Sequence, residues 1–160
     1  MNPDSGTDLP GEEIRLRVDV ATQMLHLLRG VQVVRSFPVS TSRFGLGCEE
    51  GSYRTPLGRF RIAGKIGEGA PPGTIFRGRV PTGELARAGG EEDLILTRIL
   101  WLDGLQPDNA NTHERFIYIH GTNQEDKIGT AASHGCIRMK NDEIAELFDL
   151  IPDGAEVEIA

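Results

Sequence analysis

A cysteine and two histidines stand close together in a polar, glycine-containing stretch near the end of the chain. Cys136 follows Ser133, His134 and Gly135 directly, and His120 lies sixteen positions before it. A thiolate is the nucleophilic form of cysteine, but a free thiol with a pKa of about 8.5 is mostly protonated at neutral pH. A neighbouring imidazole can take that proton and leave a thiolate–imidazolium pair. These residue types therefore predict nucleophilic catalysis by Cys136 with a neighbouring histidine as its base.

The glycine before the cysteine favours acyl transfer as the reaction. Gly135 lets a substrate backbone approach closely, and the N–H groups of Gly135 and Cys136 could both point at one developing oxyanion. Such a pair of donors stabilises the tetrahedral intermediate formed when a thiolate attacks a carbonyl. The stretch from Ser133 to Cys136 thus supplies both a nucleophile and a candidate oxyanion hole.

Three other interpretations of these residues remain open on the sequence. Cys136 could be a structural thiol, and His120 could be a hydrogen-bonded histidine of the core. His120, His134 and Cys136 could bind zinc, although their spacing matches none of the common zinc patterns. The chain has only two cysteines, so a single bridge between Cys48 and Cys136 is the only possible intramolecular disulfide.

Strands are expected to carry these residues, because period-two alternation and short apolar runs dominate the chain. Residues 14–20 alternate apolar and charged side chains, which is typical of a half-buried strand. Two apolar runs that meet across Arg29-Gly30 predict a hairpin. Further strands are expected at residues 60–62, 94–102, 116–120 and 155–159.

A helix is expected only near the C-terminus, apart from one short segment. Ile144, Leu147, Phe148 and Ile151 are spaced as one helix face, and Asn141-Asp142-Glu143 supplies a cap and acidic first turn. Residues 64–93 are rich in Gly, Pro and charge, with a short helix expected at 84–88. So long an insertion is more often a functional loop or lid than filler.

Length and charge narrow the class of protein. The 160 residues predict one domain at 13–160, preceded by a flexible leader at 1–12. The net charge of −7 argues against nucleic acid and against anionic membranes as partners. No apolar run approaches the roughly 20 residues that span a bilayer. No cofactor is expected.

The polar first thirteen residues set the expected location. They contain neither the basic n-region nor the apolar h-region of a signal peptide. We therefore expect a cytoplasmic protein. A sequence trimmed of its signal would look the same, and that protein would be periplasmic.

The motifs resemble those of the L,D-transpeptidase catalytic domain, or YkuD, family. The family pattern is a His-Gly-Thr-Asn-like run, a spacer, and Ser-His-Gly-Cys followed by an apolar residue and Arg or Asn. The chain has His120 to Asn123 and Ser133 to Arg138 in these places, together with family-like upstream signatures at 39–42 and 55–60. The likeness covers residues 14–159 and implies a YkuD-like β-sandwich or barrel. One departure is Ser42 and the long loop through Cys48, where the family often has Gly and a shorter connection.

The resemblance implies a role for each site residue. Cys136 becomes the acyl-accepting nucleophile, His120 its general base, and the carbonyl of Gly121 the group that orients the imidazole. Backbone amides near His134 and Gly135 would hold the oxyanion. Ser133 and Arg138 would shape the site, with Arg138 able to meet a substrate carboxylate bidentately. Thr122 and Asn123 are weaker candidates, and Cys48 matches no catalytic position of the family.

The resemblance further implies attack on the L,D bond between the third residue, commonly meso-diaminopimelate, and D-Ala of a peptidoglycan tetrapeptide. The partner is then a tetrapeptide stem or muropeptide. Water as acyl acceptor gives an L,D-carboxypeptidase, which the expected cytoplasmic location favours because wall fragments are recycled there. An amine acceptor gives an L,D-transpeptidase that forms crosslinks or exchanges D-amino acids. A non-catalytic peptidoglycan-binding module is the remaining alternative.

Overall fold

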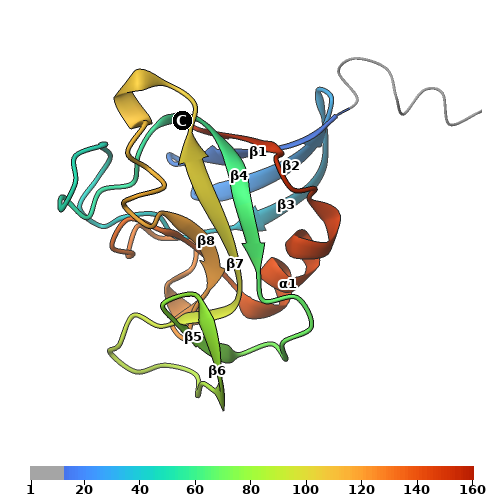
Figure 1. The fold of residues 1–160 in the computed structure, drawn as a ribbon, viewed down its shortest axis with the longest axis vertical. Coiled ribbons are helices and arrows are strands. Elements are labelled where there is room, and N and C mark those ends of the chain that lie inside the picture. The colour runs from blue at the N-terminus through green and yellow to red at the C-terminus, as the bar shows by residue number, and fades with distance from the viewer. Residues whose placement is uncertain (1–12) are drawn as a thin grey trace, which may run out of the picture.

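The mainly β architecture expected from the sequence is confirmed by the structure, a computed structural model that describes residues 13–160 (Figure 1). The leader expected at 1–12 lies outside the described residues, and the division of the chain into leader and domain stays a prediction. The strands are β1 (Ile14–Asp19), β2 (Met24–Arg29), β3 (Gln32–Pro38), β4 (Gly58–Ile66), β5 (Thr74–Arg77), β6 (Val80–Leu85), β7 (Ile95–Gly104), β8 (Tyr118–Gly121), β9 (Ile137–Met139) and β10 (Glu156–Ile159). One α-helix, α1 (Asn141–Leu150), and two 3-10 turns at Pro107–Asn109 and Glu125–Lys127 complete the described elements.

The strands form one ten-stranded sheet whose order differs from the order in the chain. The path runs β3-β2-β1-β10-β4-β7-β5-β6, and β8 leaves it from β7 to pair with β9. Two of the pairings are parallel, β1 with β10 and β8 with β9. The second parallel pair matters for function, because it sets two distant segments of the chain side by side.

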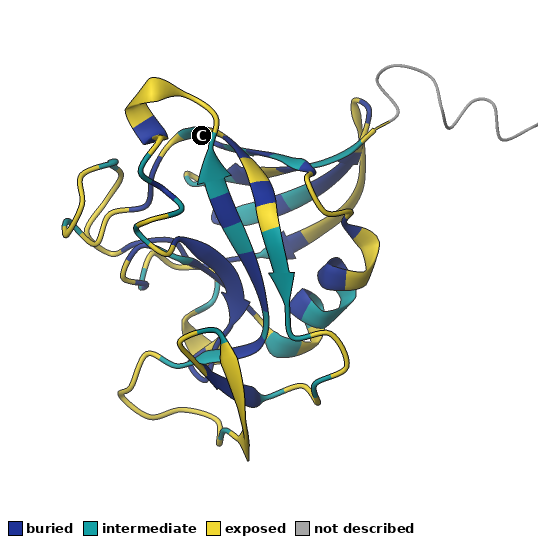
Figure 2. Ribbon diagram, viewed as in Figure 1, coloured by how far each residue is buried: buried dark blue, intermediate teal, exposed yellow. Residues whose placement is uncertain are grey.

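The core lies between the curved sheet and α1. In β1, Leu16 and Val18 are fully buried, as the alternation predicts. The apolar face of α1 packs against the sheet through Ile144, Leu147 and Phe148. Each fully buried side chain of this size contributes about 1.5–3 kcal/mol relative to exposure. Figure 2 shows the buried stretches on the inner strands and the exposed residues on the β5–β6 hairpin and the connecting loops.

Most of the expected elements are found within a few residues of their predicted bounds. The hairpin across Arg29-Gly30 is β2 and β3, and the four further expected strands are β4, β7, β8 and β10. Strands β5 and β9 were not predicted. Within residues 13–160, no helix is both long and apolar enough to cross a bilayer.

Two local expectations are wrong. The short helix expected at 84–88 is absent, because residues Val80–Leu85 form β6, which pairs with β5 across a turn at Gly78 and Arg79. The start of α1 is also capped differently. The first helical residue is Asn141, and its N–H donates to the carboxylate of Glu125 at 2.7 Å. The carboxylate of Glu125 therefore caps the helix, in place of the local Asn or Asp side chain expected from the sequence.

Candidate active site

The parallel pairing of β8 with β9 brings Cys136 beside the strand that carries His120. His120 lies opposite Arg138, so Cys136, just before β9, lies beside Tyr118. The N–H of Tyr118 donates to Cys136 Sγ at 3.3 Å. Directly paired residues of neighbouring strands share a face, and so do residues two apart in one strand. Cys136 and His120 therefore lie on one face, two positions apart along the paired strands.

The backbone of the next residue holds the imidazole of His120. His120 is 2% exposed, and its Nδ1 lies 2.5 Å from the carbonyl oxygen of Gly121. A carbonyl accepts only, so Nδ1 carries the proton and Nε2 keeps the lone pair that can accept one from a thiol. Only glycine fits at 121, because a Cβ there would lie 2.7 Å from the carbonyl oxygen of Leu96 and collide with the Asn141 side chain.

Burial keeps both reacting groups uncharged at rest. It raises the pKa of the Cys136 thiol to about 11, although the Tyr118 N–H and nearby arginines act in the opposite direction. Burial also lowers the pKa of His120, which the hydrogen bond to Gly121 only partly offsets. The resting pair is thus thiol and neutral imidazole rather than the ion pair expected from the sequence. The proton must move as the sulfur attacks.

The sulfur itself is held by two backbone groups. Besides accepting from Tyr118, Cys136 Sγ donates to the carbonyl of Phe116 at 3.4 Å. The thiol is half-buried. Residues 116 and 118 thus fix the position of the nucleophile before substrate arrives.

Ser133 shapes the turn that presents the nucleophile. Its hydroxyl donates to the carbonyl of Cys136 at 2.6 Å and accepts from the N–H of Gly135 at 3.2 Å. The amide of Gly135 is therefore engaged within the turn, which differs from its expected role in the oxyanion hole. The amides of His134 and Cys136 remain the candidate donors.

The upstream loop supports the same turn from outside. Thr55, fully buried, donates its hydroxyl to the carbonyl of Gly135 at 3.0 Å and accepts from the N–H of Ser42 at 2.9 Å. Gly135 has φ +124°, a conformation in which a side chain is strained. Ser42, the departure from the family pattern, donates to the carbonyl of Tyr53 and so ties the long loop to itself.

Arg138 is buried and already paired, so it does not reach substrate as the resemblance suggests. Only 1% of its side chain is exposed; its two Nη atoms bind Asp93 at 2.8 Å and Gln124 at 3.0 Å. The other carboxylate oxygen of Asp93 lies 3.0 Å from His134 Nδ1. Arg138 therefore anchors the segment around Asp93 beside the nucleophile turn. The sequence analysis missed Asp93, since it lies in a charged loop without a motif.

The weaker candidates act on the loop before β7. The side-chain amide of Asn123 donates to the carbonyls of Gly89 at 2.7 Å and Glu92 at 2.9 Å. The Thr122 hydroxyl accepts from the N–H of Gln124 at 3.0 Å. Asn123 thus fixes the end of the 64–93 insertion, and the Thr122 hydroxyl fixes the backbone of the turn that follows β8.

The disulfide and zinc interpretations of the cysteines find no support in the geometry of the described residues. Both Cys48 and Cys136 are free thiols. Among residues 13–160 no three His, Cys, Asp or Glu side chains are grouped as metal ligands, so His120, His134 and Cys136 do not form such a set.

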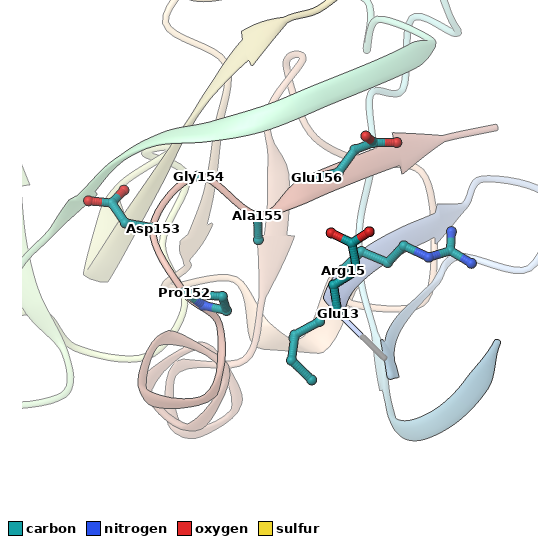
Figure 3. A pocket seen from close by; sticks show the side chains of 8 residues that line it. Glu13, Arg15, Pro152, Asp153, Gly154, Ala155 and Glu156 are labelled. Carbon is teal, nitrogen blue, oxygen red and sulfur yellow. The ribbon is translucent and has the colours of Figure 1, made fainter. Parts of the chain in front are cut away.

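Two hollows differ in their relation to this site. One of about 280 Å³ is lined by Tyr53, Phe116 and His134 among others, and so adjoins the residues that hold Cys136. Another, of about 520 Å³, lies between the start of β1 and the turn before β10, and Glu13, Arg15 and Asp153 line it (Figure 3). The second shares no residue with the site around Cys136.

Comparison with known proteins agrees with this geometry. The sequence profile of the YkuD family, described as the L,D-transpeptidase catalytic domain, matches residues 13–159. The chain belongs to this family and is a cysteine enzyme of its type. A relative that carries the family's name, YqjB of Bacillus subtilis, is 50% identical over 50 residues, which are 31% of this chain and 28% of YqjB.

Solved structures share the fold. An L,D-transpeptidase from Mycobacterium smegmatis superposes with a TM-score of 0.61 at 18% identity, covering 92% of this chain and 58% of that one. An L,D-transpeptidase solved in complex with imipenem gives a TM-score of 0.57 at 19% identity, with 92% and 58% covered. The chain thus spans little more than half of these structures and less than a third of YqjB.

Proposed function

We propose that the protein cleaves the L,D bond of peptidoglycan tetrapeptide stems through a thioester on Cys136. The observation that carries the proposal is the β8–β9 pairing, which sets Cys136 and His120 on one face with His120 oriented by the carbonyl of Gly121. The family profile supplies the substrate class, since L,D-transpeptidases act on stem peptides. The free thiol and the buried neutral imidazole supply the chemistry.

The first half-reaction uses these groups in order. Cys136 Sγ attacks the carbonyl of the third stem residue while its proton passes to His120 Nε2. The oxyanion forms against the amides of the nucleophile turn. Its collapse breaks the bond to D-Ala, whose nitrogen takes the proton from His120. A thioester, free D-Ala and a neutral His120 remain.

For the acceptor we propose water, which would make the enzyme an L,D-carboxypeptidase acting on soluble tetrapeptides or muropeptides. His120 would then deprotonate the water, and the thiol would leave with that proton. This choice carries forward the cytoplasmic location and recycling role expected from the sequence. An amine from a second stem or a free D-amino acid is the alternative, and it would make the enzyme an L,D-transpeptidase.

Incubation with a disaccharide tetrapeptide tests the function directly. Mass spectrometry is expected to show a tripeptide product and an acyl adduct on the intact protein. Cys136→Ala should abolish both, because the proposed thioester forms on the Cys136 sulfur. Cys48→Ser is the matched control and should retain them. A crosslinked dimer, or D-amino-acid exchange at the expense of tripeptide, would contradict water as acceptor while keeping the thioester.

A carbapenem gives a second test that does not depend on the acceptor. Imipenem should add its mass to the wild-type protein and to Cys48→Ser, but not to Cys136→Ala. The expectation follows because a strained β-lactam acylates the same sulfur. Absence of the adduct from reduced wild-type protein, together with no D-Ala release, would refute the proposed function.

A further inference from the structure

An arginine from the β5–β6 hairpin lies over the aromatic residues that surround the nucleophile. The guanidinium of Arg79 sits 4.5 Å from the ring centre of Trp101 and 5.1 Å from that of Phe116. Its Nη1 donates to the hydroxyl of Tyr118 at 2.9 Å. In Figure 1 this hairpin lies at the end of the sheet beside the start of β7. Arg79 is thus held in place by three side chains.

Two of the residues that hold Arg79 also hold the reacting sulfur. The carbonyl of Phe116 and the N–H of Tyr118 both contact Cys136 Sγ, at 3.4 and 3.3 Å. Cys136 packs against the same cluster as Tyr118 and Trp101. The backbone N–H of Tyr118 contacts the sulfur, and its side-chain hydroxyl contacts Arg79. The guanidinium therefore lies about one tyrosine side chain away from the N–H that binds the sulfur.

The charge of Arg79 is not matched within the described part of the chain. Among residues 13–160 no carboxylate forms an ion pair with it, in a protein with an excess of seven acidic groups. Only one hydrogen bond from its five N–H groups is recorded between described residues. Arg79 also adopts φ +68°, a conformation that side chains other than glycine rarely take. The guanidinium of Arg79 is thus a positioned cation at the edge of the site, with no carboxylate partner among the described residues.

We propose that Arg79 is a specificity residue that binds the side-chain carboxylate of the third stem residue, as in meso-diaminopimelate. This inference rests on the proposed function and names the chemistry of its substrate. A planar guanidinium matches a carboxylate with two parallel hydrogen bonds. Arg138, the arginine expected to do this from the sequence, is buried, and its two Nη atoms are paired with Asp93 and Gln124.

The side chain of the third stem residue has the length needed to extend from the sulfur to Arg79. Its own carbonyl is attacked by Cys136, and its side chain in diaminopimelate ends in a carboxylate several bonds away. Tyr118 spans a comparable length between the sulfur and Arg79. The carboxylate of the leaving D-Ala lies only one carbon beyond the scissile nitrogen, so it stays closer to the sulfur.

The test compares two tetrapeptides that differ at the third residue, one with meso-diaminopimelate and one with L-lysine. The wild-type enzyme should release D-Ala from the first with a kcat/KM about 10- to 100-fold higher, the size expected for one charge-assisted contact. Arg79→Met should lose that preference by slowing only the diaminopimelate substrate. Arg79→Lys should retain part of it. Arg77→Met, an exposed arginine of the same hairpin, is the matched control and should behave as wild type.

Equal activity of the wild type on both peptides, or equal slowing of both by Arg79→Met, would overturn the proposal and leave Arg79 a structural strap. Amidating only the distal carboxylate of diaminopimelate repeats the comparison without any variant, in case Arg79→Met does not fold. Terminal D-alaninamide that slows the wild type on both peptides, but not Arg79→Met, would assign Arg79 to the leaving group, against the proposal.

A binding measurement separates this inference from the proposed function. Calorimetry with Cys136→Ala compares the two unreacted tetrapeptides, and the diaminopimelate peptide should bind at least tenfold more tightly, an advantage lost on adding Arg79→Met. Wild-type protein that releases D-Ala from neither peptide and takes up no imipenem would refute the proposed function. Equal binding of both peptides would refute the role of Arg79.

Discussion

At the scale of single residues, burial favours the uncharged forms of the Cys136 thiol and the His120 imidazole. Removal from water shifts the pKa of Cys136 upward and that of His120 downward, so each group favours its neutral form. The carbonyl of Gly121 fixes the imidazole tautomer that can accept a proton. In the proposed mechanism, proton transfer from Cys136 to His120 is therefore coupled to attack on the carbonyl.

Alkylation of Cys136 should follow the pH dependence of a thiol with a pKa near 11. With that pKa only about one molecule in 10⁴ is thiolate at pH 7. The rate with iodoacetamide, measured by intact mass in the Cys48→Ser background, should rise about tenfold per pH unit from pH 7 towards 10. The alkylation rate rises with pH because the fraction of Cys136 in the thiolate form rises.

A thiolate–imidazolium pair would give a different profile. Its alkylation rate would level off near neutral pH, because the thiolate would already be formed there. A plateau between pH 6 and 8 would therefore contradict the neutral resting pair. Cys136→Ala in the same background serves as the control for alkylation at other side chains.

At the scale of elements, two segments far apart in sequence are joined by short polar contacts. Ser40 and Arg138 exchange two backbone hydrogen bonds of 2.9 Å, which attach the start of the upstream loop to β9. Thr55 then ties that loop to the carbonyl of Gly135. The conformation of the nucleophile turn therefore depends on residues about 80 positions earlier in the chain.

Thr55→Val should loosen this connection while conserving shape. Valine leaves the N–H of Ser42 and the carbonyl of Gly135 without their buried partner. The free energy of unfolding in urea is expected to fall by about 1–3 kcal/mol, and imipenem acylation should slow. Thr55→Ser keeps the hydroxyl and is the matched control. A loss in Thr55→Ser with none in Thr55→Val would show that packing of the methyl group, not the hydrogen bonds, supports the turn.

At the scale of the whole molecule, the C-terminal segment completes the sheet and covers its core. Strand β10 lies between β1 and β4, pairing parallel with one and antiparallel with the other. Helix α1, just before it, buries Leu147 fully against the sheet. The site depends on this arrangement because Asn141, at the start of α1, abuts Gly121 and donates to the carbonyl of Thr122 at 2.8 Å.

Leu147→Ala should destabilise the whole molecule, because it leaves a cavity between α1 and the sheet. Denaturant unfolding is expected to show a loss of about 2–5 kcal/mol. Leu150→Ala, in the same helix but 45% exposed, is the matched control and should change stability by no more than about 0.5 kcal/mol. Similar losses in the two variants would show that burial of Leu147 does not set the contribution of α1.

Local pattern was enough to predict most elements, and it singled out Cys136 and His120 as the candidate reacting pair. Period-two alternation placed β1, and the spacing of Ile144, Leu147 and Phe148 placed α1. The motifs around His120 and Cys136 indicated the family. The 84–88 region was misjudged because Val80–Leu85 is exposed along its length, so no burial pattern marks it as a strand.

What the sequence determined by itself is what short-range physics fixes: the alternation of strands, the amphipathic helix, and a cysteine and histidine of the right types. What only the tertiary structure decided is which distant groups meet. In the sequence Arg138 is a candidate for binding substrate, but in the structure it is paired with Asp93. Arg79 belongs to no motif, and only the β5–β6 hairpin places it over Trp101. Protonation was decided in the same way, because the pKa values of Cys136 and His120 depend on burial that no local pattern encodes.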